Sequence, residues 1–273
     1  MNPTKKNIRS YLKNLPVPIS YDNFVDKDVQ SLLLPLNLMQ TIQFCPKYCI
    51  KDNFIYPNSC LSNLLSLCGT ILFMSLFLYE LYSVSPLLSY DITYVIHIFT
   101  YIVYCVGFLI NLKNNISYTN DNILFVLKFQ KIHRYFNEKV SFKRFIISNW
   151  VVIILFKTAF ISTVTSFCIT INFSVIQLFT SLNLLSFDTN IIYAIKLIQL
   201  LKDKVDLWNI KALRDYGSEG RDKEDYCRKM FQAYVNILDC YDIYRVVFQQ
   251  MVSKHKIIFS CIGQIFVAVI SKP

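Results

Sequence analysis

Long apolar runs without a single charged residue constrain this chain more than any other feature of its sequence. Residues 60–79 and 92–112 contain no Asp, Glu, Lys or Arg. Each run has about the 20 apolar residues that a helix needs to cross a bilayer. Between Arg144 and Asp188 the only charge is Lys157, and this stretch is long enough for two helices. The sequence therefore predicts an all-α, multi-span membrane protein. Its predicted spans are 59–82, 91–112, 145–170, 174–201 and a short one at 257–270.

The composition excludes several other classes of protein. Charged residues make up 17% of the 273 residues, against about a quarter in a soluble domain, and the mean hydropathy is +0.38. Five glycines are too few for collagen or for a glycine-rich nucleotide-binding fold. Residues 1–30 have no apolar core, so no cleaved signal peptide is expected. The net charge of +10 lies in segments that alternate with the apolar runs, which favours membrane topology over nucleic-acid binding.

The distribution of Lys and Arg predicts how the chain is oriented in the membrane. The segments between the predicted spans contain, in order, seven, none, seven, none and eleven of these residues. Because basic residues stay on the cytoplasmic side, the N-terminus is predicted to be cytoplasmic. This orientation argues against a G-protein-coupled receptor. It also predicts a multi-pass protein in contact with the lipid bilayer.

Three segments are predicted to lie in the cytoplasm. The N-terminal segment, 1–58, contains an apolar stretch at 31–44 that fits a helix lying at the inner surface or packed on the bundle. The loop at 113–144 contains a helical pattern near its middle. The region at 202–256 is predicted to form two helices and to act as an anchor-like region for subunit association, with a solvated linker as the alternative. The candidate subunit contacts share one helix face: Met230, Tyr234, Ile237, Tyr241, Tyr244 and Phe248.

No pattern typical of a catalytic or metal site is present in the sequence. The histidines, His97, His133 and His255, lie in different segments, and the chain has no phosphate-binding loop or hydrolase motif. None of the nine cysteines falls in a predicted outer loop, so no structural disulfide is expected. Cys45 and Cys49 lack the second pair of ligands that a zinc site needs. We therefore expect neither an enzyme, nor a cofactor, nor a bound metal.

Two charged residues fall inside predicted spans. Lys157 and Asp188 lie at similar depths, about 18 and 20 Å from the inner ends of neighbouring antiparallel helices. Since an isolated charge in lipid costs at least a few kcal/mol, we expect the two side chains to pair with each other or to face a polar cavity. Such a pair could also serve a membrane transporter.

The outer halves of the second, third and fourth spans are rich in aromatic and small polar side chains. This mixture suits a small, mostly apolar organic ligand held by a few hydrogen bonds, although each residue taken singly is as typical of helix packing. The candidate ligand-binding residues are Tyr94, His97, Tyr101, Phe160, Thr163, Phe167, Thr180, Asn183 and Phe187.

Three stretches of the chain resemble insect gustatory receptors of the lepidopteran type. They are LLLPLNLMQTIQFCPKYCIKDNFIYPNS at Leu32–Ser59, NIIYAIKLIQLLKDKVDLWNIKAL at Asn190–Leu213 and AYVNILDCYDIYRVVFQQMV at Ala233–Val252. The resemblance extends over most of residues 30–255 and agrees with the cytoplasmic N-terminus. It implies a chemoreceptor-like bundle in the plasma membrane and a ligand-gated, non-selective cation channel built as a homo- or hetero-tetramer with other gustatory receptor subunits. Its implied ligand is a small tastant, of the bitter type.

The chain departs from this family at its C-terminal end. The signature of the seventh helix, Thr-Tyr followed by five apolar residues and Gln-Phe, is absent, so about five of the seven helices are expected and the chain is expected to be truncated. Three alternatives stay open: a transporter, a non-conducting accessory subunit and an odorant receptor.

Overall fold

The computed structural model describes residues 23–84, 92–136, 139–170, 178, 185–215 and 223–270. The predicted helical class is confirmed, because nearly all of the described chain is helical. The helices are α2 (Lys27–Ile42), α3 (Cys60–Val84), α4 (Ile92–Ser117), α5 (Thr119–Phe136), α6 (Lys139–Thr170), α8 (Leu185–Asp215) and α9 (Lys223–Ile270), and a small hairpin contains β1 (Cys49–Lys51) and β2 (Phe54–Tyr56).

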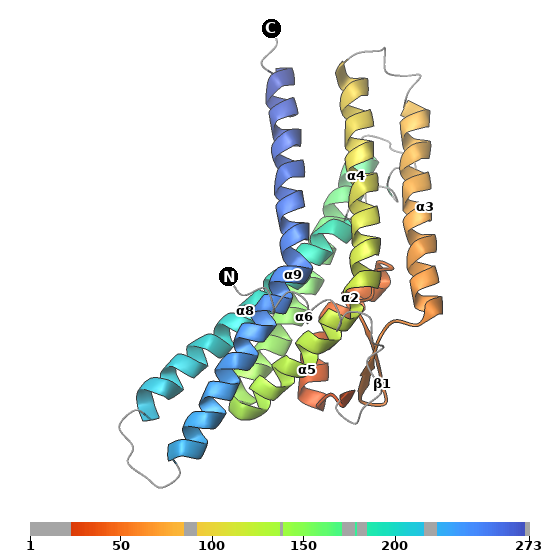
Figure 1. Cartoon of the computed structure of the whole chain (residues 1–273). Coiled ribbons are helices and arrows are strands. Elements are labelled where there is room, and N and C mark those ends of the chain that lie inside the picture. Colours follow the sequence, from red (N-terminus) through yellow and green to blue (C-terminus); the bar gives the residue numbers. More distant parts are fainter. Residues whose placement is uncertain are drawn as a thin grey trace, which may run out of the picture.

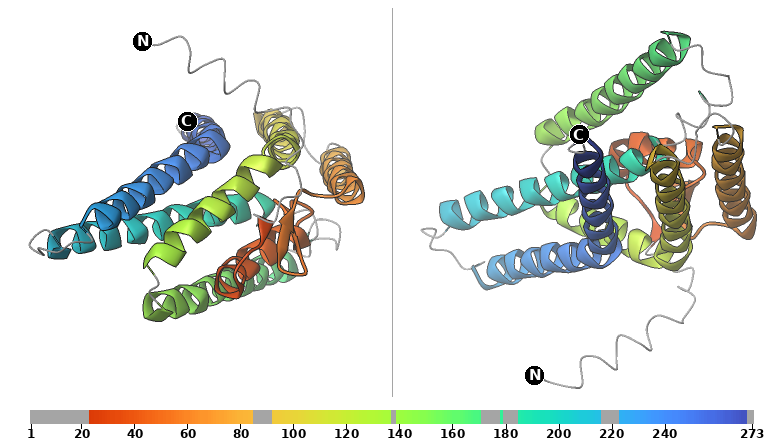
Figure 2. Two further views of the ribbon diagram at one scale, coloured as in Figure 1. Left: turned by 60° about the horizontal axis from the view of Figure 1, so that its bottom comes forward. Right: turned by 90° about the horizontal axis from the view of Figure 1, so that it is seen from above.

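The helices form two tiers that share several elements (Figure 1). In the upper tier, α3, α4 and the C-terminal half of α9 run roughly side by side. In the lower tier, α5 packs against α9, and α8 packs against the same helix. Figure 2 shows α2 between α6 and α5, and α2 makes its most extensive contacts with α6. The helix α9 runs from the lower tier into the upper one, and the C-terminal half of α6 rises to the level of α4, whereas α8 lies mainly in the lower tier (Figure 1).

Two helices are long and apolar enough to cross a membrane, judged by length and composition in the described residues alone. They are Cys60–Ser83 within α3 and Lys143–Thr170 within α6. Only 28% of the first apolar window and 11% of the second are buried inside the chain. Their exposed apolar side chains include Leu61, Leu64, Leu65, Ile71 and Leu72 on α3, and Ile147, Val151, Ile154, Leu155 and Ile169 on α6.

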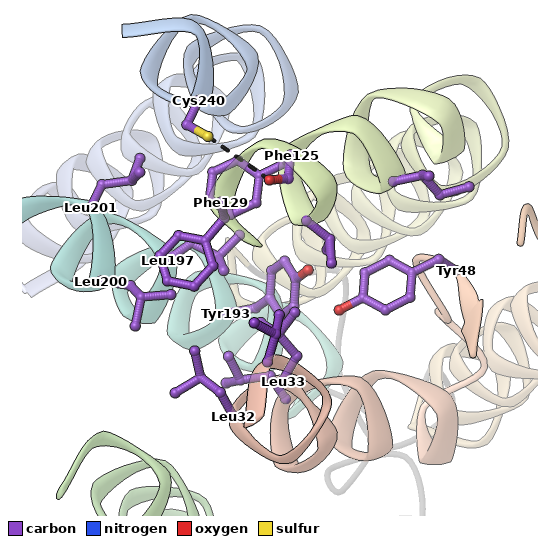
Figure 3. Packing of buried hydrophobic residues seen from close by; sticks show 14 of the residues in the cluster. Leu32, Leu33, Tyr48, Phe125, Phe129, Tyr193, Leu197, Leu200, Leu201 and Cys240 are labelled. Carbon is purple, nitrogen blue, oxygen red and sulfur yellow. Dashed lines mark hydrogen bonds between the residues drawn. The ribbon is translucent and has the colours of Figure 1, made fainter. Parts of the chain in front are cut away.

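The hydrophobic core lies in the lower tier, where α2, α5, α8 and α9 meet (Figure 3). Leu32 and Leu33 of α2 lie opposite Phe129 of α5 and Leu197 of α8, and all four are buried. Burying an aliphatic or aromatic side chain of this size contributes about 1.5–3 kcal/mol. The N-terminal segment predicted at 31–44 thus contains a helix that packs on the bundle rather than lying free at a surface.

The hairpin is an element that the sequence did not predict. Cys49 pairs with Tyr56 and Lys51 with Phe54, and the turn residues Asp52 and Asn53 have φ angles of 54° and 67°. Two consecutive residues with positive φ are typical of a tight two-residue hairpin turn, and Asn and Asp tolerate this conformation best after glycine. The hairpin places Tyr48 in the core and leads directly into α3.

The helices run further than the sequence patterns suggested. The predicted cytoplasmic helix near 201–213 is continuous with α8, and the short run at 257–270 is the end of the 48-residue helix α9. Likewise, α4 continues to Ser117, beyond the uncharged run that ends at residue 112. Changes in polarity along these helices determine which part of each helix is buried. They do not end the helices, because no helix-breaking residue lies at the predicted boundaries.

Candidate functional site

The predicted ligand-binding residues lie on α4, α6, α8 and the segment before α8. Thr180 and Asn183 lie outside the described residues, as do the side chains of Tyr94, His97 and Phe187. Tyr101 is half-buried and packs against the small aromatic cluster of Phe73, Phe77 and Phe108 between α3 and α4. Its contacts there are those of a helix-packing residue, so a role in ligand binding stays a prediction.

The three candidates on α6 lie on its exposed, outer half. Phe160 is half-buried and stacks on Phe156, with ring centroids 6.4 Å apart. Thr163 is exposed, and its hydroxyl donates a hydrogen bond back to the carbonyl of Ala159. Phe167 is also exposed. Since α6 packs mainly on α2 and α4 packs mainly on α3, the structure does not bring Tyr101 together with these residues.

The structure describes the side chain of one member of the predicted charge pair. Lys157 is half-buried on α6, and the side chain of Asp188, near the start of α8, lies outside the described residues. The pairing of these two groups therefore stays a prediction.

Much of the helix face predicted for subunit contact packs against other helices of the same chain. Met230, Ile237 and Phe248 are buried, because this face of α9 packs on α5 and α8. The hydroxyl of Tyr135 donates to the sulfur of Met230 at 3.4 Å, and Phe248 packs on Tyr193 with ring centroids 5.7 Å apart. The other three residues differ: Tyr234 and Tyr241 are exposed, and Tyr244 is half-buried. The amphipathic pattern identified the apolar face of α9, but it could not identify α5 and α8 as the helices that this face contacts.

A buried polar cluster at the lower end of α4 is the feature that sequence reasoning missed. The Lys47 ammonium donates a hydrogen bond to Oδ1 of Asn115 at 2.6 Å, and both residues are buried. Among the described residues, Lys47 forms no ion pair with a carboxylate. Burial therefore lowers the pKa of Lys47 to about 8, and burial raises the pKa of the nearby Cys45 thiol. The burial of Lys47 could not be predicted from the local sequence, because Asn115, the residue that contacts it, is 68 positions away.

A second set of buried polar groups joins α2 to the helices around it. The Gln40 side chain donates to the carbonyl of Thr189 on α8, at the long distance of 3.5 Å, and Asn149 of α6 donates to the carbonyl of Leu32 at 3.2 Å. Tyr48 points its hydroxyl toward that of Tyr193 (Figure 3). Burial raises the pKa of Tyr48 well above its ordinary value, so its hydroxyl stays neutral.

Ion pairs fix the start of α2 and the middle of α9 to α5. Arg134 donates to both carboxylate oxygens of Asp26, at 2.7 and 2.8 Å, and Lys128 lies 2.6 Å from a carboxylate oxygen of Asp239. The Gln130 side chain accepts from the backbone N–H of Asp26 and donates to the carbonyl of Phe24. The contact with Arg134 holds the pKa of Asp26 below its ordinary value.

These buried polar groups and ion pairs hold helices against one another in the described part of the chain. No group of three or more His, Cys, Asp or Glu side chains that could hold a metal ion occurs there. Comparison of the chain with protein-family models, with curated proteins and with solved structures gave no match. The fold defines a mostly helical protein in which two helices have the length and apolar character of membrane spans.

Proposed function

We propose that this chain is a subunit of a chemoreceptor in the plasma membrane, of the gustatory type, which opens a non-selective cation path when a small compound of the bitter type binds. The observation that carries the proposal is the exposed apolar surface of the upper tier above a packed, polar-rimmed lower tier. An apolar helix in the core of a soluble protein is mostly buried, whereas the apolar windows of α3 and α6 are mostly exposed. A surface of this size needs lipid or a partner to cover it.

The charge distribution supports a cytoplasmic lower tier. The three segments predicted to be cytoplasmic contain seven, seven and eleven Lys and Arg residues, and the predicted outer loops contain none. The described parts of these three segments meet mainly in the lower tier. Basic residues are retained on the cytoplasmic side, so the lower tier and the N-terminus would face the cytoplasm.

The continuity of α9 supports a receptor rather than a passive anchor. This helix ends in the upper tier and packs on α5 and α8 in the lower tier (Figure 1). A ligand that binds in the upper tier can shift an equilibrium only by binding one arrangement better than the other. The rigid helix would then carry that difference to the lower tier.

Evoked current in cultured insect cells tests this proposal. Because the signature of the seventh helix is absent from this chain, cells would express the tagged chain together with other gustatory receptor subunits, and whole-cell current would be recorded during application of bitter plant compounds, sugars and buffer. We expect an inward cation current with at least one bitter compound that is missing when the tagged chain is left out, and none with buffer. Phe160→Ala should move the dose–response curve to higher concentration, because Phe160 is a predicted ligand contact. Ile161→Ala, at the adjacent exposed position, is the matched control and should leave the curve unchanged.

Two results would contradict the proposal. One is an N-terminal tag that antibodies reach in intact cells, since this would reverse the predicted orientation. The other is the absence of any evoked current when surface labelling shows the chain at the plasma membrane.

A further inference from the structure

The contact between α3 and α4 is aromatic in its middle and polar at its lower end. Phe73 and Phe77 of α3 pack on Phe108 of α4, with ring centroids 5.4 and 6.0 Å apart. Residues three and seven positions after Phe108 lie on the same face of the helix, about 4.5 and 10.5 Å further down. These residues are Asn111 and Asn115, so the face of α4 that is turned toward α3 ends in two amide side chains.

A buried ammonium group lies at the same end of the helix pair. Lys47 donates to Oδ1 of Asn115 at 2.6 Å, and Figure 1 shows the hairpin that follows Lys47 below the lower ends of α3 and α4. The chain just before Lys47 is held against α3, because Phe44 packs on Phe73 with ring centroids 6.0 Å apart. The exposed fractions of Lys47, Asn111 and Asn115 are only 3%, 3% and 1%, so all three polar groups are shielded from solvent.

The cluster of Lys47, Asn111 and Asn115 has more hydrogen-bond donors than acceptors. Nδ2 of Asn111 and Nδ2 of Asn115 are buried and have no hydrogen-bond partner among the described residues. The same residues offer the ammonium of Lys47 the oxygen of Asn115 but no carboxylate. The nearby Cys45 thiol does not supply a negative charge, because burial raises its pKa. Within the described chain, the cluster therefore holds one positive charge without a negative counterpart and two amide nitrogens without acceptors.

We propose that Lys47, Asn111 and Asn115 form a binding site for a small monovalent anion, with chloride as the occupant. A buried charge is costly unless it is paired, and a buried donor is costly unless it is hydrogen-bonded. An anion between the three side chains meets both requirements. A water molecule could accept from the amides, but it would leave the charge of Lys47 uncompensated. The site does not depend on the proposed receptor function, because it needs only the folded chain.

Charge and close packing favour a monatomic anion over a phosphate or a carboxylate. The single positive charge of Lys47 balances a single negative charge. The cluster contains no arginine, whose planar fork of N–H groups matches phosphate and carboxylate. Gly69 of α3, four residues below Phe73, shows how closely this level is packed, because a Cβ there would lie 2.7 Å from Cγ of Phe44. Chloride is the abundant cellular anion that meets these conditions.

Thermal unfolding of the purified full chain in detergent tests the site, with chloride replacing gluconate at constant ionic strength and neutral pH. Raising chloride to about ten times its Kd should raise the midpoint of unfolding by roughly 3–5 °C for a chain of this size. Lys47→Met should abolish this shift. Lys113→Met, which removes an exposed lysine near the same end of α4, should keep it.

A second variant supplies the missing negative charge from within the chain. Asn115→Asp places a carboxylate oxygen at the position that accepts from Lys47. We expect this variant to be at least as stable as the wild-type chain in gluconate and to show no response to chloride. It also keeps the proposal testable if Lys47→Met does not fold.

Several results would overturn the proposal. They are an unchanged wild-type midpoint in chloride, the full shift in Lys47→Met or Asn115→Asp, or loss of the shift in Lys113→Met. An equal shift with inorganic phosphate at the same ionic strength would overturn the selectivity for a monatomic anion. Because bound chloride is a counter-charge, the lowered pKa that burial gives Lys47 is expected in gluconate, and chloride should raise that pKa.

Discussion

The upper and lower tiers use similar apolar residues for opposite purposes. On α6, Leu155 is 62% exposed, whereas Leu197 of α8 is 1% exposed and lies in the core. The lower tier has its own core, closed by α2, α5, α8 and α9. Among the described residues of the upper tier, the buried apolar cluster is the small aromatic one between α3 and α4, with Phe73, Phe77 and Phe108.

The difference between the tiers shows which apolar surfaces are buried by contacts within this single chain. The lower-tier helices bury one another's apolar faces, whereas the apolar windows of α3 and α6 are mostly exposed in the described part of the chain. Folding stability measured in detergent should therefore depend on the lower tier, and surface placement in cells should depend on the upper one.

Truncating matched leucines gives the largest expected effect and tests this contrast directly. Leu197→Ala should lower the free energy of unfolding by about 2–5 kcal/mol, because it removes buried methyl groups and leaves a cavity. Leu155→Ala should stay within about 0.5 kcal/mol of wild type, as an exposed position does. Thermal unfolding of the purified chain in detergent measures both. Equal losses would mean that the outer face of α6 is packed against protein, and the contrast between the tiers would fail.

The buried lysine predicts a pH dependence of comparable size. Because burial lowers the pKa of Lys47 from 10.5 to about 8, the folded chain binds fewer protons than the unfolded chain between these values. The contribution of Lys47 to the free energy of unfolding should therefore rise with pH over this window, by about 3 kcal/mol in total. Because burial raises the pKa of the Cys45 and Cys240 thiols from 9.0, these groups act in the opposite direction above pH 9, so the Lys47 contribution is the difference between the wild-type chain and Lys47→Met.

Unfolding in detergent at pH 7, 8, 9 and 10 measures the slope for each variant. Lys51→Met changes an exposed lysine in the nearby hairpin and should keep the wild-type slope. Equal slopes for the wild-type chain and Lys47→Met would mean that Lys47 has a counter-charge or is hydrated, and that the lower tier is less tightly closed around the lower end of α4.

The sequence predicted what depends on local pattern. The uncharged runs at 60–79 and 92–112 fall within α3 and α4, because a helix long enough to span a bilayer is recognisable from composition alone. The hairpin escaped prediction because its strands are three residues each and its turn depends on Asp52 and Asn53 adopting positive φ. Nothing in their neighbourhood, such as a glycine, signals that turn.

The candidate site was less predictable than the fold because it depends on contacts distant in sequence. Periodicity identified the apolar face of α9, yet Met230 and Phe248 face α5 and α8 instead of another subunit. The contact of Lys47 with Asn115 joins segments that no local pattern connects. The predicted ligand-binding residues and the pair of Lys157 with Asp188 stay predictions.

A glycine on α3 tests whether the lower end of this helix belongs to the packed tier. A Cβ at Gly69 would lie 2.7 Å from Cγ and 2.8 Å from Cβ of Phe44, which is too close for atoms near the root of a side chain. Gly69→Ala should therefore destabilise the chain by about 1–2 kcal/mol, since overpacking outweighs the gain in helix propensity. Thermal unfolding in detergent measures the change.

The substitution should change sign when Phe44 is removed. Phe44 has a φ of 57°, a conformation that glycine adopts without strain. In a Phe44→Gly background, Gly69→Ala should stabilise the chain by about 0.5–1 kcal/mol, because only the helix-propensity term remains. Destabilisation of equal size in both backgrounds would place the obstruction elsewhere along α3.

The smallest expected effect concerns the ion pair that joins the start of α2 to α5. Its side chains are partly exposed, so Arg134→Ala should cost only about 0.2–1 kcal/mol at neutral pH. Since Arg134 lowers the pKa of Asp26 from 3.8, the stabilisation is present above pH 3.8 and is lost as the pH falls through the lowered value. A double-mutant cycle with Asp26→Asn, measured at pH 7 and near pH 3, isolates this coupling. Arg228→Ala, which breaks a more exposed pair within α9, should have no measurable effect. A larger cost for Arg134 than for Leu197 would mean that charge rather than apolar packing holds the lower tier together.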